Sequence, residues 1–324
     1  MPDVPSQLDP ALDFEWRVLD QADTRIVADL QHRIEKADGI PYRTSEDEVR
    51  ELFSTSDGFL GMGGFVEGRL RAFGYIRIFD DEPVVASCQG GVDPKFRGLG
   101  FGSALVEWHT RTATLALQEI EAESKQIIFN VEEGHRSLET HLLDWGYQWN
   151  RSYFDVRASL EEEPSAVELD AFTTIEPWDS VDETEIEKAM NRVISAEEGR
   201  TETSKWTAQD RAGFVPEWSF VAMSHRADRP EVAGLIMASK YSQDWSVLGW
   251  REGTIDMLAV LPDFSTTDVA SALISASMQA QREKGMEAVV AGLSSSSATS
   301  MMSVYDSLGF TTVSTSRVYS LVLS

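Results

Sequence analysis

The chain has 324 residues, 42% of them hydrophobic, and a formal net charge of −26 at pH 7. A strongly acidic surface repels nucleic-acid phosphates and anionic membranes, so we expect neither as a partner, and a cationic small molecule is the partner that the charge favours. A single cysteine excludes an intrachain disulfide, and no Cys/His spacing typical of a metal site is present.

The first half of the chain predicts a strand, two helices, three strands that begin with a hairpin, and then alternating helices and strands. The expected elements are a strand at 14–19, a helix at 24–37, a short helix opened by a capping box at 45–48, strands at 59–66, 70–79 and 84–92, a long helix at 102–121, a strand at 126–131, a helix at 137–145 and a strand at 153–160. The acidic, proline-containing segment 161–171 lacks periodicity and is the expected linker.

The second half repeats this order. The expected elements are a strand at 172–178, a helix at 183–194, strands at 218–223, 232–240 and 252–260, a helix at 269–283, a strand at 288–293, a helix at 298–308 and a strand at 313–323. At an offset of 168 residues, Val92, Pro94, Phe96, Ser103, Ala104 and Leu105 fall on identical residues. We therefore expect two copies of one α+β unit with a mixed sheet and flanking helices: an N-terminal domain at 1–160, the linker, and a C-terminal domain at 172–324.

One loop of the first copy predicts a binding site for phosphate. The segment Gly91–Gly102 leaves a strand and enters the long helix, and glycines alternate at 98, 100 and 102. Such a backbone can direct several N–H groups at one anion beside the positive end of the helix dipole. A Walker A loop is excluded because Gly-Lys-Ser/Thr is absent. A dinucleotide fingerprint stays open but fits less well, because Ser103 replaces its third glycine and the preceding strand follows hairpins.

The same loop matches the pattern V-x-P-x-x-[RQ]-G-x-G-x-[GA] at every fixed position: Val92, Pro94, Arg97, Gly98, Gly100 and Gly102. It resembles the acyl-CoA loop of the GNAT (GCN-type N-acetyltransferase) family, and the order of elements resembles that fold in a tandem layout of the mycothiol synthase type. The resemblance implies that the N-terminal domain binds acetyl-CoA, without a metal. The residues expected to bind it are Val92, Arg97, Gly98, Leu99, Gly100, Phe101, Gly102, Ser103 and His135, with the end of the strand at 84–92 splayed to open a slot.

In this family a tyrosine often stands four residues before the glycine that caps the last helix, where it protonates the departing thiolate. That position is Leu142 in the first copy and Tyr305 in the second. We predict His141, next to Leu142, and Tyr305 as candidate general acids. The second loop has no glycine or arginine and carries Asp263 and Asp268, so we do not expect it to bind CoA in the usual way.

These features predict an N-acetyltransferase that moves an acetyl group from acetyl-CoA to a small-molecule amine acceptor. A non-catalytic acyl-CoA-binding or scaffold protein and a dinucleotide-dependent oxidoreductase are the alternatives. Glu82 is a candidate base, and Cys88 is expected to pack in the core because no cation or base stands near it in sequence. Without a signal peptide or an apolar span, the sequence predicts a cytoplasmic protein. The oligomeric state stays open.

Overall fold

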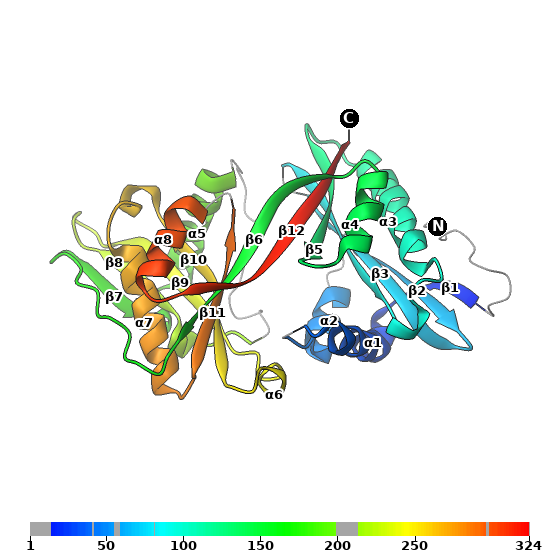
Figure 1. Cartoon of the computed structure of the whole chain (residues 1–324). Helices are drawn as coiled ribbons and strands as arrows, with labels where there is room; N and C mark the ends of the chain where they lie inside the picture. The colour runs from blue at the N-terminus through cyan, green and yellow to red at the C-terminus, as the bar shows by residue number, and fades with distance from the viewer. Residues whose placement is uncertain are drawn as a thin grey trace. The chain divides into compact units, whose positions relative to one another are not determined.

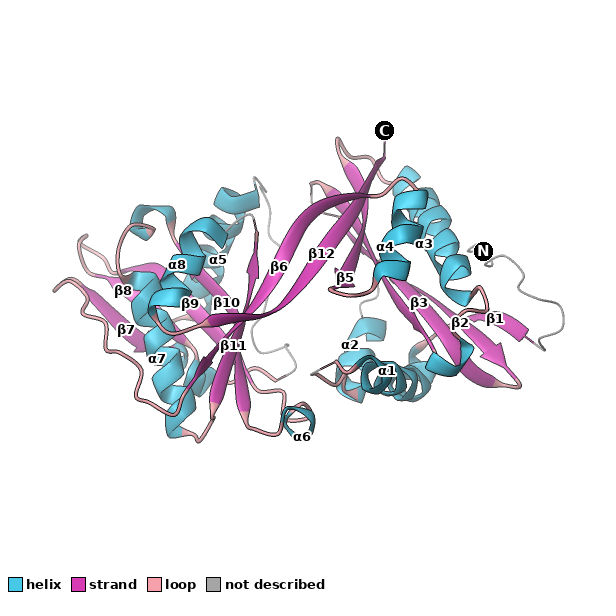
Figure 2. Ribbon diagram, in the orientation of Figure 1, coloured by secondary structure: helices cyan, strands magenta, loops and turns pink. Residues whose placement is uncertain are grey.

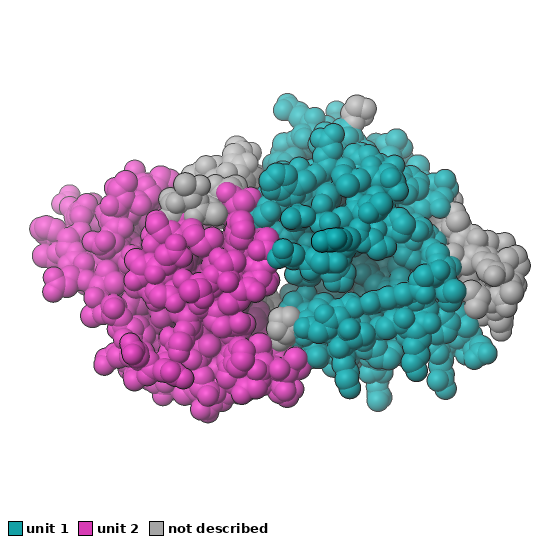
Figure 3. Space-filling view, viewed as in Figure 1, with its two compact units in different colours: residues 1–152, 316–324 teal, residues 153–315 magenta. Residues whose placement is uncertain are grey.

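The computed structural model describes residues 14–40, 42–54, 59–80, 82–198, 213–295 and 298–323. They belong to two compact units, shown in teal and magenta in Figure 3: unit 1, Met1–Ser152 with Ser316–Ser324, and unit 2, Tyr153–Thr315. None of the helices in the described ranges combines the length and the apolar character needed to cross a bilayer.

Unit 1 is a mixed sheet with helices on both faces. Its elements in chain order are β1 (Phe14–Val18), α1 (Thr24–Asp38), α2 (Glu46–Ser54), β2 (Phe59–Val66), β3 (Arg69–Phe79), β4 (Val84–Val92), α3 (Phe101–Gln118), β5 (Lys125–Glu132), α4 (Arg136–Asp144) and the end of β12 (Thr311–Leu323). The strand order is β1-β2-β3-β4-β5-β12, with only β4 and β5 parallel. Helices α1 and α2 cover one face, and α3 and α4 cover the other (Figure 1).

Local sequence signals account for several of these elements. The β2–β3 hairpin turns at Glu67 and Gly68, which have φ values of 50° and 70°, the left-handed pair that a two-residue turn requires. The capping box predicted before α2 is present, because the Glu48 amide donates to Ser45 Oγ at 3.1 Å and the Ser45 amide donates to the Glu48 carboxylate at 2.6 Å. Both features are therefore confirmed as predicted.

Unit 2 repeats the architecture. Its elements are the end of β6 (Gln148–Ser159), β7 (Thr173–Pro177), α5 (Glu183–Glu198), β8 (Phe220–Ser224), β9 (Glu231–Ser239), α6 (Trp245–Leu248), β10 (Glu252–Val260), α7 (Val269–Glu283), β11 (Ala288–Ser294) and α8 (Ala298–Ser307). The strand order is β6-β11-β10-β9-β8-β7, with β10 and β11 parallel (Figure 2). The predicted fold class, a mixed sheet with flanking helices in two copies, is confirmed; the short helix α6 was not predicted.

The two repeats exchange their last strands. Residues 153–159 of β6 pair with β11 in unit 2, and residues 316–323 of β12 pair with β5 in unit 1. Tyr319 of β12 accordingly lies in a hydrophobic core of unit 1, and Val156 of β6 lies in that of unit 2. The boundaries expected from sequence, 1–160 and 172–324, assign each of these strands to the repeat that precedes it. Hydrophobic alternation identifies a strand but does not identify its partner, which here is more than 120 residues away.

Candidate donor-binding site

The glycine-rich loop of unit 1 forms an open nest of backbone amides at the start of α3. Gly98 and Gly100 have φ values of 76° and 89°, which only glycine adopts without strain. The first hydrogen bond within the helix runs from the Ala104 amide to the Gly100 carbonyl at 3.0 Å, so the amides of Gly102 and Ser103 precede the helical ladder. A Cβ built on Gly98 or Gly102 would meet no atom within 4 Å. The nest therefore has room for an anion.

Strand β4 separates from β5 just before this nest. It pairs with β3 to its last residue, Val92, but its pairing with β5 stops at Cys88. The Asp93 amide donates to the Arg71 carbonyl of β3 at 2.7 Å. Successive residues of an antiparallel strand direct their backbone N–H and C=O groups alternately to one side and the other, so this bond sets the direction for the residues before Asp93. Gly90 and Val92 consequently direct their backbone groups toward the β5 side, beyond the end of the β4–β5 ladder. A split with outward backbone polar groups agrees with the slot expected from sequence.

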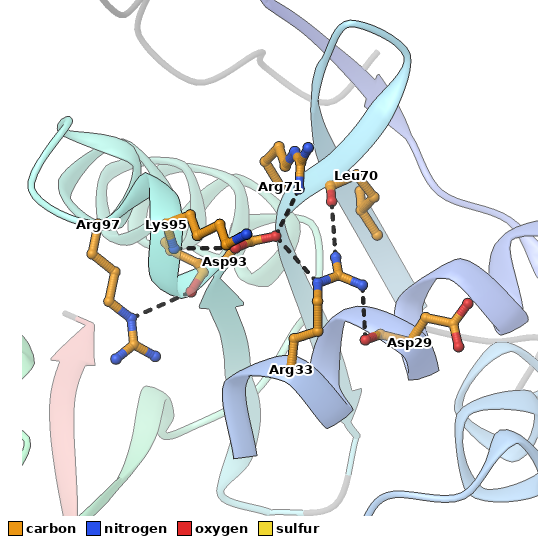
Figure 4. Close-up of polar contacts among 8 residues, drawn as sticks. Asp29, Arg33, Leu70, Arg71, Asp93, Lys95 and Arg97 are labelled. Atoms are coloured by element: carbon orange, nitrogen blue, oxygen red, sulfur yellow. Dashed lines mark hydrogen bonds and ion pairs between the residues drawn. The ribbon is translucent and has the colours of Figure 1, made fainter. Parts of the chain in front are cut away.

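Asp93 anchors the loop that joins the split to the nest. Its side chain is buried and accepts hydrogen bonds from the Lys95 amide at 3.1 Å, from Arg71 Nη1 at 3.0 Å and from Arg33 Nε at 3.2 Å (Figure 4). Burial by itself would raise the pKa of Asp93, but the Lys95 amide and the two guanidinium groups together hold that pKa below its ordinary value. The carboxylate thereby ties the loop to β3 and to α1.

Asp93→Asn is expected to lower the free energy of unfolding by about 2 kcal/mol at neutral pH, because it removes the buried charge that pairs with the partly buried Arg71 and the more exposed Arg33. Since folding depresses this pKa, the carboxylate contributes its stabilisation above the unfolded value of 3.8 and loses it as the pH falls through the lower folded value. Urea denaturation should therefore show the difference between wild type and variant shrinking from about pH 5 to about pH 3. A difference that stays constant over this range would contradict the assignment.

Arg97, predicted as the cation at the rim of the nest, is engaged elsewhere. Its guanidinium pairs with both oxygens of Asp38, at 2.6 and 2.8 Å, and its Nε lies 3.4 Å from the Val92 carbonyl (Figure 4 shows the latter contact). The Asp38 hydrogen bond raises the pKa of Arg97 despite partial burial. Asp38 is the last residue of α1, so the ion pair ties that helix to the loop and offsets the positive charge.

Two predicted residues meet at the nest. His141 Nε2 of α4 lies 3.2 Å from Ser103 Oγ, on the first turn of α3. His135 is the residue immediately before α4, and its amide donates to the Glu132 carbonyl at 3.3 Å. Leu142, at the position where the resemblance would put a tyrosine, is fully buried in the core. The role of His141 as a general acid stays a prediction, and the structure places its ring beside Ser103.

The corresponding loop of unit 2 lacks a nest. Between Val260 and α7 no residue has a positive φ, and Asp263 and Asp268 are exposed there. Tyr305 lies in the core of unit 2 against Phe310, with a ring centroid distance of 4.9 Å. Burial raises the pKa of the Tyr305 phenol, so the hydroxyl stays protonated, the form that an acid requires, but its ring is enclosed by the core.

The structure also gives the surroundings of Cys88 and Glu82, two further residues singled out in the sequence. Cys88 is buried, and burial raises the pKa of its thiol, so the expectation of core packing is confirmed. Glu82 accepts hydrogen bonds from the amides of Glu123 and Ser124, at 3.2 and 2.6 Å. It precedes β4, whereas the split lies at the other end of that strand, roughly 20 Å away at 3.3 Å per residue. The Glu82 carboxylate is thus engaged by two backbone amides at the end of β4 that is remote from the split, and its role as a base stays a prediction.

Sequence reasoning missed His109. Its buried Nε2 lies 3.0 Å from the carbonyl of Gln89, the first residue of β4 beyond its pairing with β5, so Nε2 carries the proton. Burial lowers the pKa of His109 to about 4, although the hydrogen bond to the Gln89 carbonyl by itself would raise that pKa. The ring is therefore neutral near pH 7. A Cβ on Gly74 would lie 2.7 Å from this imidazole. Neither residue stands in a recognisable motif, and only the packing of α3 on β3 and β4 reveals the contact.

Comparisons with known proteins agree on the fold. The sequence matches no family model and no curated protein sequence. The structure is similar to a GCN5-related N-acetyltransferase from Sphaerobacter thermophilus, with a TM-score of 0.75, 19% identity and coverage of 98% of this chain and 97% of that one. It is also similar to a tandem GNAT protein from the clavulanic acid biosynthesis pathway, with a TM-score of 0.68, 15% identity and coverage of 96% and 98%.

A third similar structure is a glucosamine N-acetyltransferase region of a fungal multi-domain β-N-acetylglucosaminidase. Its TM-score is 0.69 at 12% identity, and the match covers 99% of this chain and 39% of that one. The likeness at these identities concerns the fold, and it extends over both units. The doubly wound sheet of a dinucleotide-binding oxidoreductase is excluded, since β4 follows an antiparallel hairpin and only its pairing with β5 is parallel in unit 1.

Proposed function

We propose that this chain, which has the tandem GNAT fold, is an acyl-CoA-dependent N-acetyltransferase whose unit 1 binds acetyl-CoA and whose acceptor is a small-molecule amine. The observation that carries the proposal is the combination, in one unit, of a glycine nest at the start of α3 and a split between β4 and β5 directly before it. A nest suits a diphosphate, and a split with outward backbone groups suits an extended amide-containing arm.

Different residues of unit 1 would bind different parts of the donor. The backbone from Arg97 to Ser103 would hold the diphosphate, and His135 and His141 would border the donor from α4. The outward backbone groups of Val92 would follow the pantetheine arm. The Gly90 amide, directed to the β5 side of the split, would stabilise negative charge on the thioester oxygen during attack by the amine. The new C–N bond would form as the C–S bond breaks, and the amine proton would leave with the thiolate or to solvent.

Unit 2 has a different role in this proposal. Exposed carboxylates at Asp263 and Asp268 occupy the region where phosphates would bind, and no left-handed glycine forms a nest there. We therefore assign the donor to unit 1 alone. Residues 316–323 of β12, which belong to unit 1, complete its sheet by pairing with β5, so the donor site would depend on the C-terminal end of the chain.

A non-catalytic acyl-CoA-binding protein is the second candidate. It is favoured by Leu142 in the core at the position of the usual acid and by the pairing of Arg97 with Asp38. Such a protein would keep the nest and the split but would have no group to complete the transfer.

Thermal unfolding with acetyl-CoA tests the site. A ligand at about 100 times its Kd stabilises the folded state by about 2.7 kcal/mol, a shift of several degrees in Tm. We expect this shift with acetyl-CoA and not with NADH. Release of free CoA thiol in the presence of aliphatic amines, amino sugars or amino acids tests the transfer. Stabilisation without thiol release would favour the second candidate, and no stabilisation would overturn both.

A further inference from the structure

The buried His109 of α3 lies over the point where β4 and β5 part. Its ring centroid is 5.3 Å from that of Phe129, which pairs with Cys88 at the last step of the β4–β5 ladder. Its Nε2 lies 3.0 Å from the carbonyl oxygen of Gln89, the next residue along β4. Gln89 and Gly90 are exposed, whereas Cys88 is buried. The imidazole therefore contacts the peptide that joins the first two residues of β4 beyond the ladder.

Two glycines that pair across β3 and β4 make room for this ring. Gly74 pairs with Gly90, and a Cβ on Gly74 would lie 2.8 Å from His109 Nε2. A Cβ on Gly90 would lie 3.4 Å from His109 Cε1. Neither glycine has a positive φ, so the space that the imidazole occupies, and not the backbone conformation, accounts for the missing side chains. The sheet thus carries no side chain between the imidazole and the Gln89 carbonyl.

The Gln89 carbonyl does not need this hydrogen bond for its own satisfaction. Gln89 pairs with Tyr75 of β3, and the alternation counted from the Asp93–Arg71 bond makes this a hydrogen-bonded pair of the ladder. The imidazole is therefore a second donor to the same oxygen. Its Nδ1, in contrast, is buried and finds no hydrogen-bond partner in the part of the chain that the structure describes, which is energetically costly. A phenylalanine would fill the space without that cost, so the Nε2 hydrogen bond is what histidine adds.

This hydrogen bond fixes the direction of the Gly90 N–H. The Gln89–Gly90 peptide is planar and trans, so its C=O and N–H groups point to opposite sides. With the carbonyl held on the β3 side, the N–H is turned toward the split. A donor to the carbonyl also polarises the peptide and strengthens the N–H as a donor. The ring itself is neutral near pH 7 and 2% exposed, so it adds no charge and does not reach a bound molecule.

We propose that His109 is a positioning residue, which holds and polarises the Gln89–Gly90 peptide so that the Gly90 N–H stabilises the oxyanion formed during acetyl transfer. The proposal rests on the proposed function, because it accounts for how the Gly90 amide assigned there is held. His109 touches neither the donor nor the amine and takes no part in the bonds that form and break. Its effect falls on the chemical step more than on donor affinity, since the thioester oxygen is most negative in the transition state.

The test is infrared spectroscopy of acetyl-CoA bound to the full-length protein. Subtracting spectra recorded with unlabelled and with carbon-13-labelled acetyl groups isolates the thioester carbonyl band, which a hydrogen bond from Gly90 should move below the frequency of free acetyl-CoA. His109→Phe fills the same space without an N–H donor and should lose most of this shift, with the affinity for acetyl-CoA unchanged. His109→Gln is the matched control, because its side-chain amide keeps an N–H near the position of Nε2, and it should retain the shift.

Turnover gives a second measurement. With any aliphatic amine, amino sugar or amino acid that the wild type acetylates, kcat should fall about tenfold or more in His109→Phe while KM for acetyl-CoA stays the same. His109→Gln should recover most of the loss. The hydrogen bond itself can be checked without ligand or variant, because nitrogen-15 NMR of the wild-type protein should show a neutral His109 ring with its proton on Nε2.

Several outcomes overturn the inference. A shift that His109→Phe retains would show that the ring only fills space, and a shift that both variants lose equally would show that the N–H is not the feature that matters. A proton on Nδ1 would remove the hydrogen bond to Gln89. If acetyl-CoA binds to the wild type without any carbonyl shift, the Gly90 amide does not reach the thioester and the donor site stands without this role. If calorimetry shows no binding of acetyl-CoA, the proposed function itself falls.

Discussion

Gly102→Asp is expected to stabilise the free protein and to abolish its stabilisation by acetyl-CoA. Gly102 is the second residue of α3 and has no atom within 4 Å of an added Cβ. An acidic residue in the first turn interacts favourably with the helix dipole, and Asp has a better helix propensity than Gly, so the free energy of unfolding should rise by about 0.5–1 kcal/mol. The same carboxylate would lie where the diphosphate binds and should weaken acetyl-CoA binding at least 100-fold, about 2.7 kcal/mol.

Opposite signs for stability and binding distinguish a ligand site from a structural turn. Gly102→Ala is the matched control, since the loop pattern accepts Gly or Ala there, and it should gain stability while keeping most of its affinity. Both quantities can be read from thermal unfolding with and without acetyl-CoA. If Gly102→Asp binds acetyl-CoA with wild-type affinity, the glycine nest does not bind the diphosphate of the donor.

Neither half of the chain is expected to fold alone when it is cut at the linker. A fragment of residues 1–160 would lack β12, which pairs along residues 125–132 of β5 and buries Val318 and Tyr319. Burial of each such side chain contributes about 1.5–3 kcal/mol. Together with the lost strand pairing, this is comparable to the whole stability of a domain, about 5–15 kcal/mol. A fragment of residues 172–324 would lack β6 in the same way.

Mixing or co-expressing the two fragments should restore one folded species that binds acetyl-CoA, because each carries the strand that the other needs. Circular dichroism melts and acetyl-CoA titrations of each fragment and of the mixture measure this. The intact chain cleaved within 161–171 serves as the control and should keep its fold. Cooperative unfolding and full donor affinity in fragment 1–160 alone would contradict the strand exchange.

Local patterns predicted the elements well. The strand at 84–92 and the helix at 269–283 have the bounds expected from sequence, and Gly146 and Gly309 close their helices with φ values of 86° and 85°. These features depend on hydrophobic periodicity and on the left-handed conformation that glycine allows, both of which are local properties of the chain. The glycine nest was predictable for the same reason.

Long-range pairings were not predictable from one sequence. Nothing near β6 or β12 indicates that the two strands change places, since both alternate as any strand would. Arg97 shows the same limit for side chains: its position in the loop predicts a phosphate ligand, but its partner, Asp38, is 59 residues away. The burial of Glu35 against Thr44 is likewise a tertiary property, because a glutamate in an amphipathic helix ordinarily reaches solvent or an arginine.

A structure of the protein with acetyl-CoA bound tests the central claim most directly. The account predicts one donor per chain, with its diphosphate on the amides of residues 98–103 and its pantetheine arm between β4 and β5. A donor on the loop 261–268 of unit 2, or a donor in unit 1 that leaves the glycine nest empty, would contradict it.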